Sequence, residues 1–165
     1  MARHPLMRPY YDRHGAAHYP DVENDTMRPR TGAWIALREK GHMLMVIADN
    51  ACGVPELPGG GVDKGEALFE AALRELQEEA QISLSPHSCE VLAEYQQSVN
   101  FYADDRAEYW DYAQNFFLIQ QTGTSLYHKT IDSVPEGRRL WLSVEQMDFS
   151  AIHYFHAMAI KAFIK

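Results

Sequence analysis

The segment "RELQEEAQI", residues 74–82, places three carboxylates beside an arginine in a stretch that otherwise favours a helix. Apolar residues recur at offsets of three and four from residue 67 to about residue 80, which predicts one amphipathic helix. They are Phe69, Ala72, Leu73, Leu76 and Ala80. Glu75, Glu78 and Glu79 then share one face beside this stripe, where each like-charged pair costs the helix roughly a few tenths of a kcal/mol.

Two interpretations of this acidic face are open. A solvated surface needs no partner for the charges, whereas a divalent cation would convert their repulsion into binding, since hard ions such as Mg²⁺ take clustered oxygen ligands. The loop "PGGGVDKGE", residues 58–66, directly precedes the predicted helix. It favours the cation, because glycine lets backbone approach closely whatever the carboxylates hold.

The spacing of these residues resembles the Nudix box. That motif is a glycine, five residues, a glutamate, seven residues, Arg-Glu, an aliphatic residue, any residue, Glu-Glu, any residue, a glycine and an aliphatic residue. Eight of the nine specified positions match here, and "LPGG" precedes them as is usual. The matching positions are Gly60, Glu66, Arg74, Glu75, Leu76, Glu78, Glu79 and Ile82.

Gln81 stands where the family usually carries glycine. A glycine at a helix end normally supplies a positive φ, and another residue there costs on the order of 1 kcal/mol. We therefore expect either a different helix end or modest backbone strain at Gln81, with the carboxylates unaffected.

The resemblance implies the Nudix fold, an α/β architecture in which a mixed β-sheet is sandwiched between helices (an α/β/α sandwich). It also implies a hydrolase that cleaves the pyrophosphate linkage of a nucleoside diphosphate linked to another moiety, with Mg²⁺ or Mn²⁺ as cofactor. The alternatives are a hydrolase of dinucleoside polyphosphates or nucleotide sugars rather than of free triphosphates, and a silent module that binds a nucleotide without turnover. Silent modules generally lose box glutamates, and this sequence retains them all.

The same resemblance assigns roles to individual residues. Arg74 and Glu66 orient the metal-binding groups through contacts rather than touching substrate. The implied metal ligands are the Gly59 carbonyl, Glu75, Glu78 and Glu79, of which Glu79 is the ligand we expect most firmly.

The general base stays open. Glu136, in "VPEGRRLWLS" (residues 134–143), matches the place where MutT-type members carry an additional metal-binding glutamate, although "PEGR" is also an ordinary polar turn. Asp104, Asp105 and Glu108 compete with Glu136 for the role of base.

Substrate contacts are predicted around the segment "NFYADDRAEYWDY", residues 100–112. Tyr102, Tyr109 and Trp110 flank its acidic centre and are candidates to stack a base, although aromatic residues in strands more often serve ordinary packing. The last helix carries no asparagine near its start, so 8-oxo-dGTP is not the substrate we expect by resemblance. His153 and His156 are further candidates, against the alternatives of core packing and surface exposure.

The rest of the chain is consistent with one domain. Residues 31–38 and 42–49 predict a strand hairpin, residues 50–66 a loop, residues 89–102, 109–120 and 138–143 further strands, and residues 149–163 a closing helix. We assign residues 31–165 to the Nudix domain. Residues 1–30 have no period and form an N-terminal extension, whose His4, His14 and His18 predict a solvated tail rather than a metal site.

The amino-acid composition limits the classes of binding partner that we expect. A net charge of −8, from 15 basic against 23 acidic residues, argues against nucleic acid and anionic membranes as main partners. The partner that the resemblance implies is a small nucleotide-type diphosphate, whose phosphates an acidic protein can still bind through a metal ion. The two cysteines, Cys52 and Cys89, suggest small core residues. Without a visible export signal or apolar span we expect a cytoplasmic protein. Since some Nudix proteins form homodimers by exchanging N-terminal segments, residues 1–30 are a candidate for that use.

Overall fold

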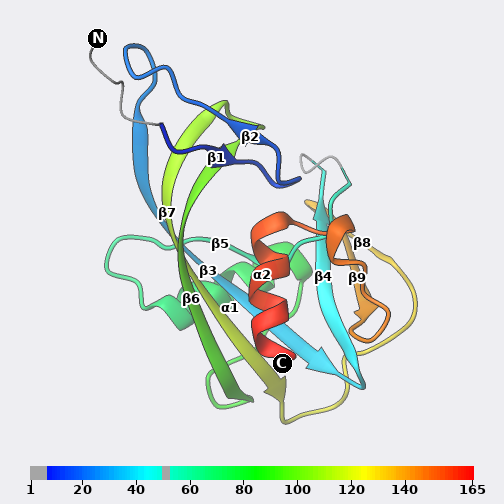
Figure 1. Cartoon of the computed structure of the whole chain (residues 1–165). Helices are drawn as coiled ribbons and strands as arrows, with labels where there is room; N and C mark the ends of the chain where they lie inside the picture. The colour runs from blue at the N-terminus through cyan, green and yellow to red at the C-terminus, as the bar shows by residue number, and fades with distance from the viewer. Residues whose placement is uncertain (1–6, 50–52) are drawn as a thin grey trace.

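The chain forms one mixed sheet with a helix on each face, as Figure 1 shows for this computed structural model, which describes residues 7–49 and 53–165. Among these residues the sheet has nine strands: eight follow the order β2-β1-β6-β7-β3-β4-β9-β8, and the ninth, β5, pairs with β3 outside this path. The strands are β1 (Tyr10–Tyr11), β2 (Ala17–His18), β3 (Met27–Glu39), β4 (His42–Ala48), β5 (Gly59–Gly61), β6 (Cys89–Ala103), β7 (Glu108–Gln121), β8 (Asp132–Val134) and β9 (Gly137–Ser143). The helices are α1 (Leu68–Ala80), the short 3₁₀ helix η1 (Phe149–Ala151) and α2 (Tyr154–Phe163).

Successive side chains of the central strands point to opposite faces of the sheet and form two hydrophobic cores. In β3, Ile35 and Leu37 pack toward α1, whereas Trp34 and Ala36 pack toward α2. The same period of two continues through β4 and β7, as expected for strands buried on both faces. Cys89 lies at the edge of the α1 core, and Cys52 lies outside the described residues. The predicted mixed sheet between helices is thus confirmed.

β3 and β4 separate beyond their turn, and the gap between the two strands is the fork of the sheet. The predicted hairpin is confirmed, but these strands pair only beside their turn, at Arg38 with Met43 and Glu39 with His42. Beyond that point β3 runs parallel to β7, and β4 continues antiparallel to β9. This divergence leaves room between the two halves of the sheet at the end away from the hairpin turn.

The glycine-rich segment fills part of this fork. Our prediction of a loop over residues 50–66 was wrong at Gly59–Gly61, which form β5 against residues 32–34 of β3. The Pro58 carbonyl accepts a hydrogen bond from Ile35 N–H at 2.9 Å, and Glu56 forms a bridge with Val46 of β4. Glycine content normally indicates a turn. Here it allows a strand to enter where side chains would not fit.

The helices agree with the sequence except at one boundary. Helix α1 is confirmed, but the predicted helix over residues 149–163 divides into η1 and α2. Ile152 and His153 between them are not helical, and His153 N–H donates to the Pro55 carbonyl at 2.9 Å. The His153 N–H therefore bonds to a distant loop instead of to a carbonyl of its own helix, which the apolar period alone had predicted. Among the described residues, no helix is both long and apolar enough to cross a membrane.

The first described residues add to the sheet rather than extend into solvent. β1 joins β6 through a parallel pairing of Tyr11 with Phe101, and β2 returns beside β1. His18 contacts Asp12 at 2.8 Å and stacks on Tyr102 with 4.0 Å between ring centroids. The expectation of a solvated tail was therefore wrong for His18, whereas His14 is exposed and His4 lies outside the described residues.

The end of α1 yields a stability prediction. Gln81 adopts the left-handed conformation, with φ 58° and ψ 33°, while its N–H donates to the Gln77 carbonyl. Since glycine reaches this conformation without steric cost, we expect Gln81→Gly to raise the free energy of unfolding by about 1 kcal/mol. Thermal unfolding should show a melting temperature higher by roughly 2–4 °C. An unchanged or lower value would mean that the Gln81 side chain compensates for the strain.

Candidate active site

A cavity of about 550 Å³ lies where the fork of the sheet meets β5, α1 and α2. One part of its wall is acidic and includes Asp49, Glu56, Glu79, Asp105 and Glu136. Another part is aromatic, and two arginines, Arg13 and Arg106, also line it. Five carboxylates against two guanidinium groups leave this cavity with an excess of negative charge.

Glu79 lies at the centre of the acidic wall. Helix α1 carries it toward β5, where its Oε2 accepts a hydrogen bond from Gly59 N–H at 3.1 Å. Burial raises the pKa of Glu79 well above its usual range, and the nearby carboxylates of Glu56, Glu75 and Glu136 raise it further. The single backbone donor opposes this rise but does not cancel the crowding.

Glu75 lies one turn earlier on α1 and packs against β5. A Cβ on Gly60 would come within 2.8 Å of the Glu75 carboxyl carbon, so a larger residue there would displace the Glu75 carboxylate. Burial raises the pKa of Glu75, while the Arg74 guanidinium, 3.0 Å away, lowers it. The β5 backbone and two box carboxylates therefore meet at one place.

Arg74 ties the loop to the helix. It donates to Glu66 at 2.8 Å and to the Gly61 carbonyl at 3.0 Å, while its Nη1 is 3.3 Å from Glu78. The hydrogen bond from Arg74 lowers the pKa of Glu66. Glu78 remains exposed beside the arginine and does not line the cavity. Arg74 thus holds Glu66 and the β5 backbone beside the box carboxylates, and the orienting role of Arg74 and Glu66 stays a prediction.

The acids fit a divalent cation chemically, although their side chains do not yet converge on one point. Within residues 7–49 and 53–165, no three His, Cys, Asp or Glu side chains are arranged as a metal-binding group. Glu75 is turned toward Arg74, and Glu79 toward Gly59 N–H. Buried carboxylates with raised pKa values are nevertheless short of positive charge, and oxygen-rich sites of this kind suit Mg²⁺ or Mn²⁺.

The candidate bases fall into different environments. Glu136, in the turn between β8 and β9, lines the cavity near Glu79. Asp105 also lines it, but Asp104 and Asp105 both accept hydrogen bonds from Arg13. Glu108 instead accepts from Trp110 Nε1 at 2.8 Å and is absent from the cavity lining.

Glu56 is a site residue that the sequence analysis missed. It precedes the "LPGG" segment, and its carboxylate lies 4.0 Å from Arg13. Burial raises the pKa of Glu56 to about 7 even though the charge of Arg13 lowers it. The sequence feature that could have indicated Glu56 is its position shortly before the Nudix box. Because β5 inserts between β3 and β4, the residues just before β5 must lie beside the same cavity.

The aromatic wall is built from several elements. Trp34, Phe101, Trp110 and Tyr112 line the cavity, and the Arg30 guanidinium lies 4.4 Å above the Trp110 ring. Of the three aromatic residues singled out in the sequence, only Trp110 lines this cavity. Tyr102 and Tyr109 are absent from that lining: Tyr102 stacks on His18 and Tyr109 donates to the Tyr19 carbonyl.

His153 and His156 are both buried and stack on each other with 4.0 Å between ring centroids. His156 Nδ1 accepts a hydrogen bond from Leu57 N–H at 3.0 Å, and burial lowers its pKa well below the usual range. Burial also lowers the pKa of His153 to about 3. Both rings are therefore neutral, and His156 supports the loop that carries Glu56.

Comparisons with known proteins agree with this architecture. The family model described as "NUDIX domain" matches residues 26–163. A MutT NUDIX hydrolase from Burkholderia pseudomallei superimposes with a TM-score of 0.58 at 22% identity, covering 81% of this chain and 97% of that chain. A C. elegans Ap4A hydrolase gives 0.56 at 19% identity, covering 81% and 94%. The E. coli dihydroneopterin triphosphate pyrophosphohydrolase gives 0.59 at 14% identity, covering 84% and 98%.

A mixed sheet between two helices, matched over most of its length by these structures, defines the Nudix fold. The family model spans nearly the whole chain, and the chain belongs to the Nudix hydrolase family. The search of curated protein sequences found no significant match. The family is therefore established by the domain match, and the structural neighbours, all below 25% identity, add the fold alone.

The raised pKa of Glu56 predicts how stability depends on pH in the metal-free protein. Its folded pKa of about 7 exceeds the ordinary 4.5, so the folded state binds the proton more tightly. This contribution is complete below pH 4.5 and is lost as the pH rises through 7. We expect Glu56→Gln to reduce the decline in melting temperature over this interval, by the equivalent of about 3 kcal/mol. Parallel slopes for the two proteins in EDTA would contradict the assignment.

Proposed function

We propose that this Nudix protein is a metal-dependent pyrophosphohydrolase that acts on a nucleotide-type diphosphate with Mg²⁺ or Mn²⁺. The observation that carries the proposal is the crowding of Glu79 by Glu56, Glu75 and Glu136 at a solvent-accessible cavity. Buried like charges are costly unless a cation or protons compensate them. A protein that needed no ion here would gain stability by replacing one of these acids.

The proposed ligand groups are the Gly59 carbonyl, Glu75, Glu78 and Glu79. A bound divalent ion supplies charge neutralisation for the phosphates and a water of lowered pKa for attack on phosphorus. Glu75 and Glu78 would have to turn away from Arg74 to hold such an ion, and their carboxylates would then supply its oxygen ligands. Arg74 then remains anchored by Glu66 and the Gly61 carbonyl, which keeps β5 and α1 in register.

Glu136 is the residue we propose as the general base. Its place in the cavity near Glu79 and Glu75 supports this role, and among the described residues its carboxylate forms no ion pair. Asp104 and Asp105 are less suited, because hydrogen bonds from Arg13 hold both carboxylates. A base must be free to accept a proton from the attacking water.

The aromatic wall is the proposed site for the nucleoside. Trp110 faces the cavity while Arg30 covers its ring, so the indole is held rigidly and can stack on a flat heterocycle. The cavity of about 550 Å³ is within the range of small-molecule sites. The structural neighbours include an Ap4A hydrolase and a dihydroneopterin triphosphate pyrophosphohydrolase, which sets the range of compounds to test.

A substrate panel with controlled metal content tests the activity. Nucleoside triphosphates, ADP-ribose, nucleotide sugars, diadenosine polyphosphates and dihydroneopterin triphosphate should be assayed with product identification. We expect hydrolysis of at least one compound with Mg²⁺ or Mn²⁺, none in EDTA, and recovery when the ion is added back. Hydrolysis that persists in verified metal-free protein would exclude a metal-dependent mechanism, and binding without turnover would favour a silent module.

Replacement of Glu79 tests the ion site directly. We expect Glu79→Gln to lower kcat by on the order of 100-fold or more at saturating Mg²⁺, because the amide keeps the acceptor for Gly59 N–H but loses the charge. The melting temperature in EDTA should not fall, since a buried, crowded charge has been removed. Glu70→Gln is the matched control, because Glu70 lies exposed in the first turn of α1. Equal kcat values for Glu79→Gln and the parent protein would overturn the assignment.

A further inference from the structure

The N-terminal turn over residues 12–18 contributes Arg13 to the lining of the cavity, although the family match begins only at residue 26. The Asp12 carboxylate accepts hydrogen bonds from the N–H groups of His14 and Ala16 and contacts His18 at 2.8 Å. The Asp12 N–H donates to the Ala16 carbonyl, so side chain and backbone close the same turn. Such a closed turn fixes the direction of Arg13.

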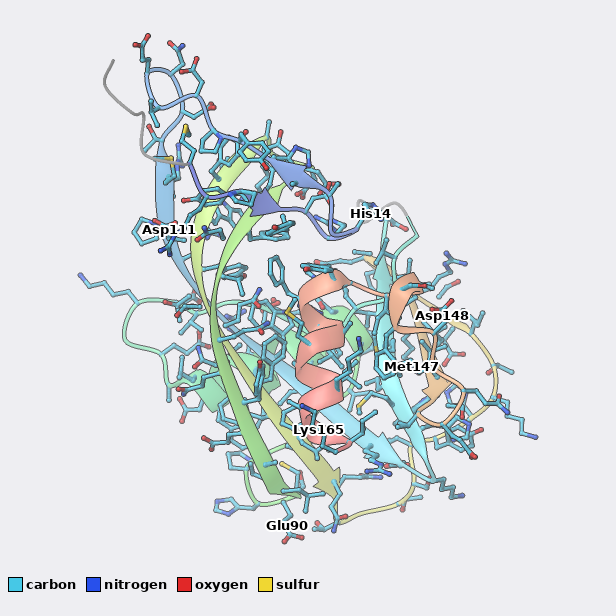
Figure 2. The ribbon with its side chains drawn as sticks, in the orientation of Figure 1. His14, Glu90, Asp111, Met147, Asp148 and Lys165 are labelled. Carbon is cyan, nitrogen blue, oxygen red and sulfur yellow. The ribbon has the colours of Figure 1, made fainter. Side chains whose placement is uncertain are left out.

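Further contacts hold this turn against the domain. Tyr154, the first residue of α2, donates its N–H to the Arg13 carbonyl at 2.8 Å. Gly15 has φ +83°, and a Cβ there would come within 2.8 Å of the Tyr154 ring. Tyr10 Oη donates to Asp111 at 2.6 Å on the other side of the segment. Figure 2 labels both ends of this arrangement, with Asp111 beside β1 and His14 at the tip of the turn, near the start of α2.

Arg13 spans two segments that are distant in sequence. Its Nε donates to Asp104 at 2.9 Å and its Nη2 to Asp105 at 3.2 Å, both in the turn between β6 and β7. Its Nη1 lies 4.0 Å from Glu56, in the segment before β5. The Arg13 side chain is only 8% exposed, so these attractions act in a poorly hydrated region. A planar guanidinium group suits three carboxylates in different directions better than an ammonium group does.

Loss of this guanidinium group would leave three carboxylates close together beside Glu79. Glu56 already raises the pKa of Glu79, and Asp104 and Asp105 raise that of Glu56. Repulsion among them would move the β6–β7 turn away from the segment before β5. Asp105 and Glu56 both line the cavity, so its shape would change there while the box helix stays in place.

We propose that Arg13 is a positioning residue that determines substrate binding, and that the N-terminal extension thereby belongs to the active site. The inference rests on the proposed function, because it concerns the cavity in which that reaction takes place. Arg13 acts by holding the carboxylates of Glu56 and Asp105 at fixed positions in the cavity wall. Those carboxylates are acceptors for N–H donors of a substrate that enters beside Trp110.

The test compares steady-state kinetics of Arg13→Ala, Arg13→Lys and the parent protein, with the best substrate of the panel and saturating Mg²⁺. We expect Arg13→Ala to raise KM by about 10-fold or more with kcat changed less than about 3-fold, since the box carboxylates are untouched. Arg13→Lys should give an intermediate KM, because an ammonium group cannot reach all three acids. Arg28→Ala is the matched control, because Arg28 pairs with Glu108 outside the cavity lining. The KM of this variant should equal that of the parent protein.

A purely structural role for Arg13 predicts different effects of these substitutions on stability and on KM. It would lower the melting temperature and the fraction of active protein, while KM stayed at the parent value in every variant that folds. That result, or a KM for Arg13→Lys equal to the parent, would overturn the proposal. If Arg13→Ala fails to fold, Arg13→Gln takes its place. KM is then expected to increase from the parent protein to Arg13→Lys and further to Arg13→Gln.

Calorimetric titration with ADP and GDP separates this inference from the proposed reaction. If the parent protein hydrolyses none of the panel, the proposed activity fails, and the affinity for these nucleotides still reports on Arg13. We expect the Kd to rise by about 10-fold in Arg13→Ala and to stay unchanged in Arg28→Ala. Equal affinities for the parent and Arg13→Ala, or no binding by the parent, would overturn the role of Arg13.

Discussion

The hydrogen bond from Gly59 N–H to Glu79 is the contact on which the arrangement of the site depends. It joins β5 to the last turn of α1, so that a half-buried carboxylate faces the glycine-rich backbone in the wall of the cavity. One backbone donor is too little to compensate this charge, as the raised pKa of Glu79 indicates. The site is therefore held together by groups that also need a further positive charge.

The fork between β3 and β4 creates the space for this contact. Because the two strands pair only near their turn, β5 can add to β3 while β4 turns to β9. The cavity lies where these strands separate, and it is closed by the buried rings of His156, in α2, and His153, just before α2. A helix, a strand of glycines and a divergent hairpin thus supply three walls of one site. The fourth wall comes from the N-terminal turn and Arg13.

Local patterns predicted some of these features and not others. The helix over residues 68–80 follows from its apolar period, and the β3–β4 hairpin from two apolar runs separated by a short polar turn. The box motif led to the Nudix family because its spacing is long and specific. β5 escaped prediction because a run of glycines has no side-chain pattern. The parallel pairing of β3 with β7 and the break at Ile152 and His153 arise from contacts between distant segments, which local periodicity does not encode. The same limit concealed Glu56 and Arg13.

The hydrogen bond between the Arg13 carbonyl and Tyr154 N–H joins residues near opposite ends of the chain. The cavity wall that Arg13 supplies therefore depends on a contact between residues far apart in sequence. Closing so long a loop costs more conformational entropy than closing the β3–β4 hairpin, so this wall is the less readily ordered part of the site.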